Sequence, residues 1–277
     1  TLGMAHDANR SSVLHGWLLV AICCLAVAVS YGIRYSFPVF YVSILREFGW
    51  SRADTALIFS LNTMVYGLSA TIVGKAVDSL GPRKVMTMGV VLLAVATASC
   101  SLINQMWHFY LLFGVLASFG ICAAGWVPSA AVISRWFSSR AGAAFGLLDA
   151  GLAVAFITAS GVEYMIMRVG WRSSFLALGL LAMPVAPLIA ISVSLPHHSG
   201  SLGRALPRDA GPPEAKARVS AATAKARDRR WVREEWDLPR AMATYRFWFL
   251  FFFNLLMWGV AGNLIVTHQV AFAVDQG

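Results

Sequence analysis

Charged residues are scarce in this sequence. Asp, Glu, Lys and Arg together make up 13% of its 277 residues, whereas 58% are hydrophobic and the mean hydropathy is +0.67. Because soluble domains carry about 25% charged residues, this composition excludes an ordinary soluble domain. Cysteine is also rare, with four residues that lie in apolar stretches without metal-ligand spacing, so we interpret them as small packing residues and expect no metal site. They are Cys23, Cys24, Cys100 and Cys122.

Motifs of catalysis are missing as well. The sequence contains no HExxH motif, no phosphate-binding glycine loop and no nucleophile beside a base in a motif context. We therefore predict that the protein is not an enzyme and that it needs no cofactor.

Long apolar runs are what the sequence has in abundance. Each run is long enough to cross a hydrocarbon core of about 30 Å as an α-helix. The first run is too long for the apolar part of a signal peptide, so we count it as a span. The predicted fold class is an all-α integral membrane protein with spans at about 16–40, 53–75, 84–105, 107–133, 142–166, 172–195 and 245–273.

The spacing of these runs divides the chain into three parts. Residues 1–195 hold six closely spaced spans, 196–244 form a polar segment, and 245–277 hold the seventh span. This layout is typical of a protein with two six-helix halves joined by a central loop. Because the chain opens on Thr1 and stops at Gly277 as the seventh span finishes, we interpret it as a fragment that ends early in the second half.

The net charge of +9 follows membrane topology rather than nucleic-acid binding. Lys and Arg favour the N-terminus, the loops after the second and fourth spans, and above all the segment 196–240, which has ten. By the positive-inside rule these parts are cytoplasmic. We expect a multi-pass protein of the plasma or inner membrane, surrounded by lipid, with no nucleic-acid partner; the oligomeric state stays open.

One short stretch between the second and third spans gathers charge, glycine and proline. Its sequence, GKAVDSLGPRK, places Gly74, Asp78, Gly81, Arg83 and Lys84 in eleven residues. Glycine followed by proline favours a tight turn, because glycine allows a positive φ and proline fixes φ. An acid beside bases that close this face in one state and separate in another suits alternating access.

This stretch resembles the loop motif G-x-x-x-D-x-x-G-x-R-K of the major facilitator superfamily, from which it departs at Ser79 and Pro82. Further blocks resemble the monocarboxylate-porter and oxalate/formate-antiporter branch. They are YGIRYSFPVF (31–40) with EFGWSRAD (47–54), RWFSSRAGAAFGLLDAG (135–151), GWRSSF (170–175) and EWDLPRAMATYRFW (235–248). The blocks occur in order over nearly the whole chain.

The resemblance implies a major-facilitator helical bundle, here the N-terminal six-helix half plus helix seven. It implies a secondary active transporter that works by alternating access and carries a small organic anion such as a monocarboxylate, by proton symport or anion exchange. Asp78, Arg83, Arg135 and Arg140 would form a cytoplasmic gate network. It also implies binding residues on helices eight, ten and eleven, so we expect that this chain alone does not transport.

Two other functions stay open. An exporter of a drug or a sugar-like solute is the main alternative, although residues 109–133 lack the basic residue that such members often carry in helix four. A seven-helix receptor is the remote alternative. Within the first half, Pro38 and Pro128 fit an inverted repeat of three helices, or else the general frequency of proline in membrane helices.

Arg34 is the candidate for binding the solute. It is the one Lys or Arg well inside a span, where a charge costs about 2.5–3.5 kcal/mol and is a functional hypothesis by default. Tyr31, Arg34, Tyr35 and Pro38 share one helical face, and a guanidinium can hold a carboxylate through two hydrogen bonds. The alternative is that Arg34 extends to the outer surface.

Other polar residues inside the spans have weaker cases. Asn254, Trp258 and His268 are candidates for the substrate path on helix seven, with plain packing as the alternative for His268. Asp149 could relay protons, but we favour pairing with Arg135 or Arg140.

For Asn62 we favour a hydrogen bond between helices, with substrate contact as the alternative. Two patterns indicate structural roles only. Gly142, Gly146 and Ala150 are predicted to form a face for close helix packing. Ser51 with Asp54 predicts a capping box at the start of the second span.

Overall fold

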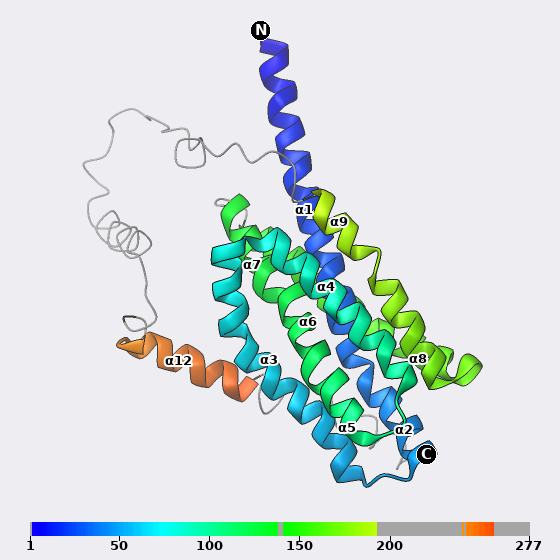
Figure 1. Ribbon diagram of the computed structural model, residues 1–277. Coiled ribbons are helices and arrows are strands. Elements are labelled where there is room, and N and C mark those ends of the chain that lie inside the picture. Colours follow the sequence, from blue (N-terminus) through cyan, green and yellow to red (C-terminus); the bar gives the residue numbers. More distant parts are fainter. Residues whose placement is uncertain (1, 138–140, 193–239, 241, 258–277) are drawn as a thin grey trace. The chain divides into compact units, whose positions relative to one another are not determined.

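The computed structural model describes residues 2–137, 141–192, 240 and 242–257, with side chains from Gly16 onward (Figure 1). Every regular element among these residues is helical. The chain divides into two units, residues 1–197 and 198–277, and each is described by itself. The predicted all-α membrane fold is confirmed.

The first span is interrupted in the middle. Helix α1 (Leu2–Tyr35) ends and α2 (Phe37–Phe48) begins on either side of Ser36. Pro38 lacks the N–H that would bond the carbonyl of Arg34 in a continuous helix, so the sequence itself interrupts the hydrogen-bond ladder. Just before the interruption, Ser36 donates to the carbonyl of Gly32 through both its N–H and its hydroxyl, at 3.1 and 2.6 Å.

The second and third spans are α3 (Arg52–Leu80) and α4 (Pro82–Ser99), the latter extended by the 3-10 turn η1 (Cys100–Leu102). The N-cap half of the predicted capping box is confirmed, because the Ser51 hydroxyl accepts from the N–H of Asp54 at 3.0 Å. The Asp54 carboxylate accepts from the Ser51 hydroxyl at 2.6 Å, where a full capping box would use the backbone N–H of Ser51. Gly81 makes the turn between the two helices at φ 84°, a conformation that favours glycine.

The fourth span changes helix type along its length. It consists of α5 (Met106–Phe109), the π-helical stretch η2 (Tyr110–Ala117), α6 (Ser118–Ala124) and α7 (Trp126–Trp136). Gly125 interrupts it just before Pro128, so both prolines lie within the first turn after a break. The inverted repeat itself stays a prediction.

The fifth and sixth spans follow each other as one long helical stretch with a break inside it. Helix α8 (Ala141–Ala182) and α9 (Val185–Ser192) make an apolar run of 52 residues, about 78 Å long and far more than one crossing of about 30 Å. Gly170 has non-helical angles, φ 81° and ψ 162°, and separates two crossings at the predicted boundary. In the second unit, α12 (Tyr245–Asn254) begins the predicted seventh span.

Helix α4 is central to the first unit. It contacts α1, α6, α8 and α9, and Figure 1 shows α1, α4 and α9 side by side. Contact with α6 is very close: a Cβ added at Gly120 would lie 2.7 Å from the backbone nitrogen of Leu93. Five of the largest fully buried side chains are phenylalanines: Phe37, Phe40, Phe109, Phe113 and Phe175.

The predicted packing face of span five is wrong for the described residues. A Cβ added at Gly142 or Gly146 would meet no atom within 4 Å, and Ala150 is exposed. The close approach on α8 occurs instead at Gly151, where a Cβ would lie 2.6 Å from the carbonyl oxygen of Cys24 on α1. The spacing of small residues was present on two faces of the helix, and the sequence pattern did not show which one packs.

A polar cluster joins three loops at the end of the unit opposite Gly81. Arg172, just after the Gly170 break, donates to the Glu47 carboxylate at 3.0 Å, to the carbonyl of Ser101 at 3.1 Å and to the Asn104 side chain at 3.3 Å. The indole of Trp171 also donates to Glu47. Arg172 thus ties the ends of α2, η1 and the second half of α8 together.

We expect Arg172→Ala to lower the melting temperature by about 2–4 °C, the shift for on the order of 1 kcal/mol in a protein of this size. The loss is modest because the Arg172 and Glu47 side chains are 36% and 43% exposed. Arg168→Ala is the matched control, since Arg168 lies on the ring of Tyr164 on its own helix. Equal melting temperatures for the two variants would contradict a joining role for Arg172.

Candidate functional site

Arg34 lies inside the first unit, in the last turn of α1. Its residue exposure is 6%, so it does not extend to the outer surface. The break at Ser36 follows two residues later, and interrupted membrane helices often supply binding groups near the bilayer centre.

The contacts of Arg34 come mainly from α3. Its Nη2 donates to the Thr63 hydroxyl at 3.0 Å, and its guanidinium carbon lies 4.9 Å from the ring centroid of Tyr66 and 5.6 Å from that of Phe59. The hydroxyls of Tyr66 and Tyr31 share a hydrogen bond of 2.7 Å. Aromatic faces attract a cation, so these rings stabilise the buried charge.

These contacts leave part of the guanidinium free. Nη1 of Arg34 is buried and makes no hydrogen bond within the described residues, and no carboxylate among them lies in salt-bridge range of Arg34. A buried cation without a paired anion is costly. The residues around Arg34 therefore have the chemistry to receive a carboxylate.

The predicted face of α1 is brought together at this place. Tyr31 lies against the break in span four, where a Cβ added at Gly125 would be 3.2 Å from its ring. Tyr35 stacks on Phe156 of α8, with ring centroids 4.6 Å apart and planes inclined by 9°. Tyr31 and Tyr35 thus link this part of α1 to the fourth and fifth spans, while Arg34 between them contacts α3.

Sequence reasoning missed the residues of α3 that hold Arg34. Phe59, Thr63 and Tyr66 recur at intervals of four and three residues, which places them on one helical face. That spacing was a signal, but the face also reads as ordinary packing until Arg34 is known to lie against it.

The loop motif brings one predicted ion pair together. Arg135 Nη2 of α7 lies 3.8 Å from the Asp78 carboxylate of α3, and the two side chains are 52% and 81% exposed. Arg83 and Lys84 are exposed beside the Gly81 turn. A Cβ added at Gly74 would meet no atom within 4 Å, so Gly74 makes no close helix contact among the described residues. Arg140 lies outside them.

Of the two partners predicted for Asp149, Arg135 is wrong, and Arg140 lies outside the described residues. The Asp149 carboxylate accepts from the indole of Trp126 at 3.1 Å, whereas Arg135 pairs with Asp78. The reason is geometric, since the first residue of α7 lies beside Asp149 and Arg135 lies more than two turns further along the same helix. No group of His, Cys, Asp and Glu that could hold a metal occurs in the part of the chain that the structure describes.

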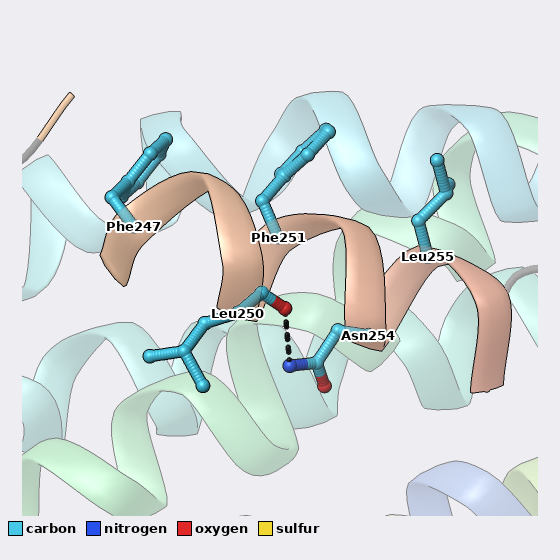
Figure 2. Close-up of a pocket in the computed structure, with 5 residues that line it drawn as sticks. All are labelled: Phe247, Leu250, Phe251, Asn254 and Leu255. Carbon is cyan, nitrogen blue, oxygen red and sulfur yellow. Dashed lines mark hydrogen bonds between the residues drawn. The ribbon is translucent and has the colours of Figure 1, made fainter. Parts of the chain in front are cut away.

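The helix-seven candidates fall in the second unit. Figure 2 shows a hollow along α12 lined by Phe247, Leu250, Phe251, Asn254 and Leu255. The Asn254 amide donates to the carbonyl of Leu250 on its own helix at 2.9 Å. Trp258 and His268 lie outside the described residues.

A comparison with protein families decides which family this bundle represents. The family model described as Major Facilitator Superfamily matches residues 23–277. The chain belongs to this superfamily. The superfamily assignment covers the interrupted spans, the Arg34 site and the loop motif alike.

Within the superfamily, the chain is similar in sequence to curated monocarboxylate transporters. The chain is 29% identical to Monocarboxylate transporter 13 of Rattus norvegicus over 181 residues, which cover 65% of this chain and 42% of that protein. It is 31% identical to Monocarboxylate transporter 4 of Rattus norvegicus, over 61% of this chain and 36% of the relative. It is 30% identical to Monocarboxylate transporter 11 of Homo sapiens, over 65% of this chain and 38% of that relative. The chain thus spans about two fifths of the length of these relatives.

A solved structure shares the fold. It is a bacterial homologue of the human lysosomal transporter Spinster, crystallised in an inward-facing, unoccupied conformation. The TM-score is 0.57 at 17% identity, and the match covers 64% of this chain and 43% of that one.

Proposed function

We propose that this protein is part of a secondary active transporter that moves a small organic anion, such as a monocarboxylate, by alternating access. The single observation that carries the proposal is the buried Arg34, whose Nη1 has no hydrogen-bond partner among the described residues. The names of the curated relatives support the same class of solute. Membership of the superfamily indicates a transporter rather than an enzyme.

The chemistry of Arg34 suits a carboxylate that must bind and leave. Thr63 holds Nη2, so the guanidinium is oriented before the solute arrives, and Nη1 remains to donate a charge-assisted hydrogen bond. The hydroxyls of Tyr31 and Tyr66, which bond each other, are further donors on neighbouring helices. Binding a small anion here neutralises the buried charge, and either a co-transported proton or an exchanged anion would keep the cycle electrically balanced.

The membrane placement belongs to the same proposal. The helical runs of the first unit are long and apolar enough to cross a bilayer. The bias of Lys and Arg supports a cytoplasmic N-terminus, and we propose a plasma or inner membrane as the location. The Asp78–Arg135 pair then lies at the cytoplasmic end, where its separation would accompany opening.

A counterflow panel tests the class of solute. The complete reading frame that contains this chain is reconstituted in vesicles loaded with unlabelled acetate, L-lactate, glucose or a quaternary ammonium ion. We expect labelled L-lactate to accumulate in vesicles loaded with acetate or L-lactate, and not in vesicles loaded with glucose or the cation. If labelled L-lactate accumulates in none of the vesicles, while labelled glucose or the labelled cation exchanges with its own unlabelled form, the exporter alternative replaces the anion proposal.

The cytoplasmic pair yields a prediction of its own. Asp78→Asn should change the free energy of unfolding by less than about 1 kcal/mol, because both side chains are largely exposed. The transport rate should nevertheless fall several-fold if the pair closes one face of the carrier. Thermal melting and initial uptake rates measure the two effects, with Glu163→Gln, at an exposed carboxylate outside the loop motif, as the control for loss of one exposed negative charge. A normal rate in Asp78→Asn would remove the pair from the gate.

A further inference from the structure

Asn62 connects the middle of α3 with the π-helical stretch of span four. Its side chain is fully buried, and its Nδ2 donates to the carbonyl of Phe113 within η2 at 2.8 Å. In the opposite direction, the Ser118 hydroxyl donates to the backbone carbonyl of Asn62 at 2.6 Å. The same two spans are therefore joined by two hydrogen bonds of opposite sense at one residue.

The element that Asn62 holds is unusual. A π-helix has i→i+5 hydrogen bonds, is rare, and is frequently found at functional sites. In a membrane, backbone groups that leave the regular pattern must find partners inside the protein, and the Asn62 amide is such a partner. The stretch also packs tightly, since a Cβ added at Gly114 would lie 2.8 Å from Cδ2 of Leu61, the neighbour of Asn62.

The segment of α3 around Asn62 also carries the groups that contact Arg34. Thr63 follows Asn62 directly and accepts from Nη2 of Arg34. Phe59 and Tyr66, whose rings face the guanidinium, lie one turn to either side.

Stacked rings form a second link between the π-helical stretch and the same site. The Phe113 ring stacks on Phe37 with centroids 4.7 Å apart, and Phe37 stacks on Phe59 at 5.8 Å. Phe113 is therefore linked to the residues around Arg34 in two ways. Its carbonyl accepts from Asn62, which precedes Thr63, and its ring stacks on Phe37, which stacks on Phe59.

We propose that Asn62 is a positioning residue for the anion site: by fixing α3 to the π-helical stretch it sets where Thr63 and Tyr66 stand against Arg34. Among the described residues no hydrogen bond joins Asn62 to Arg34. The inference rests on the proposed function, because Arg34 must bind the solute for its position to matter. A return of η2 to ordinary α-helix would move the carbonyl that Asn62 holds, and the site would change with it.

The test is Asn62→Leu in the complete reading frame, with labelled L-lactate as the probe. We expect KM to rise about tenfold while the maximal rate per inserted protein stays within about twofold. In a Thr63→Ala background the same change should raise KM much less, because the two residues act through one contact. Ser174→Ala is the matched control, since it removes a buried hydroxyl that bonds only the Gly170 carbonyl at 2.8 Å, away from Arg34.

Two outcomes would overturn the inference. One is a lower melting temperature for Asn62→Leu with unchanged KM, which is what a purely structural residue gives. The other is an effect on KM that is fully additive with Thr63→Ala. If Asn62→Leu fails to insert, deletion of Leu112 from η2 tests the same link without altering α3; a folded deletion variant with normal KM would equally reject it.

The failure of the proposed function is distinguishable from the failure of this inference. If Arg34→Gln leaves KM unchanged, the anion site at Arg34 is rejected and the positioning role with it. If Arg34→Gln raises KM and Asn62→Leu does not, only the positioning role falls.

Discussion

Arg34→Gln is expected to raise the KM for a transported carboxylate by about 10- to 100-fold, the loss that corresponds to hydrogen bonds with a charged group of about 1.5–3 kcal/mol. Glutamine keeps a polar side chain at the site but removes the positive charge and the donor at Nη1. The KM of Arg34→Lys should lie between those of the unchanged protein and Arg34→Gln, because lysine keeps the charge and loses the planar fork of the guanidinium. Uptake of labelled L-lactate into vesicles, normalised to inserted protein, measures all three.

Stability separates a binding role of Arg34 from a structural one. Its charge is buried without a carboxylate partner among the described residues, so replacing it should leave the melting temperature unchanged or raise it. Arg46→Gln is the control, since Arg46 is exposed near the end of α2. A variant Arg34→Gln that melts lower and binds the anion normally would show that Arg34 holds the fold rather than the solute.

Gly120→Ala carries a large expected effect on folding. The added Cβ would lie 2.7 Å from the nitrogen and 2.8 Å from the Cα of Leu93, and backbone atoms of α4 cannot move aside as a flexible side chain can. Overpacking of this kind costs about 1–3 kcal/mol or more, although alanine is the better helix former by about 1 kcal/mol. We expect less inserted protein and a melting temperature lower by several degrees, about 2–4 °C for each kcal/mol lost.

Gly146→Ala is the matched control for that prediction. It is the same substitution inside a helix, but its Cβ would meet no atom within 4 Å. The helix propensity of alanine then acts alone, and the melting temperature should stay the same or rise. Equal destabilisation by both variants would show that the close contact between α4 and α6 does not determine the effect, and that a partner covers Gly146.

The positions of the spans could be predicted because the bilayer fixes their length. Apolar runs of about 20 residues, the proline in spans one and four, and the Ser51–Asp54 cap are local signals, and each has its counterpart in the helices. The break at Gly170 was also predicted correctly, between the runs 142–166 and 172–195. Helix α8 extends on both sides of it, and only the backbone angles of Gly170 mark the break.

Contacts between spans could not be predicted in the same way. Small residues occur on two faces of α8, and only the packing shows that Gly151 meets α1 while Gly142 and Gly146 meet nothing described. The π-helical stretch has no sequence signal that distinguishes YLLFGVLA from an ordinary apolar helix.

Only the α1 side of the candidate site could be predicted from the sequence. The face of Tyr31, Arg34 and Tyr35 follows from helical spacing, and the cost of a charge in a span marks Arg34. Thr63 and Tyr66 lie about thirty residues away in the sequence, so their place beside Arg34 depends on how α3 packs against α1.

The measurement that tests the central claim most directly is equilibrium binding of labelled L-lactate to the purified complete protein, compared with Arg34→Gln. We expect saturable binding that acetate competes away and glucose does not, and a dissociation constant at least tenfold higher in the variant. Equal lactate affinity of the two proteins, both folded, would contradict an anion site at Arg34.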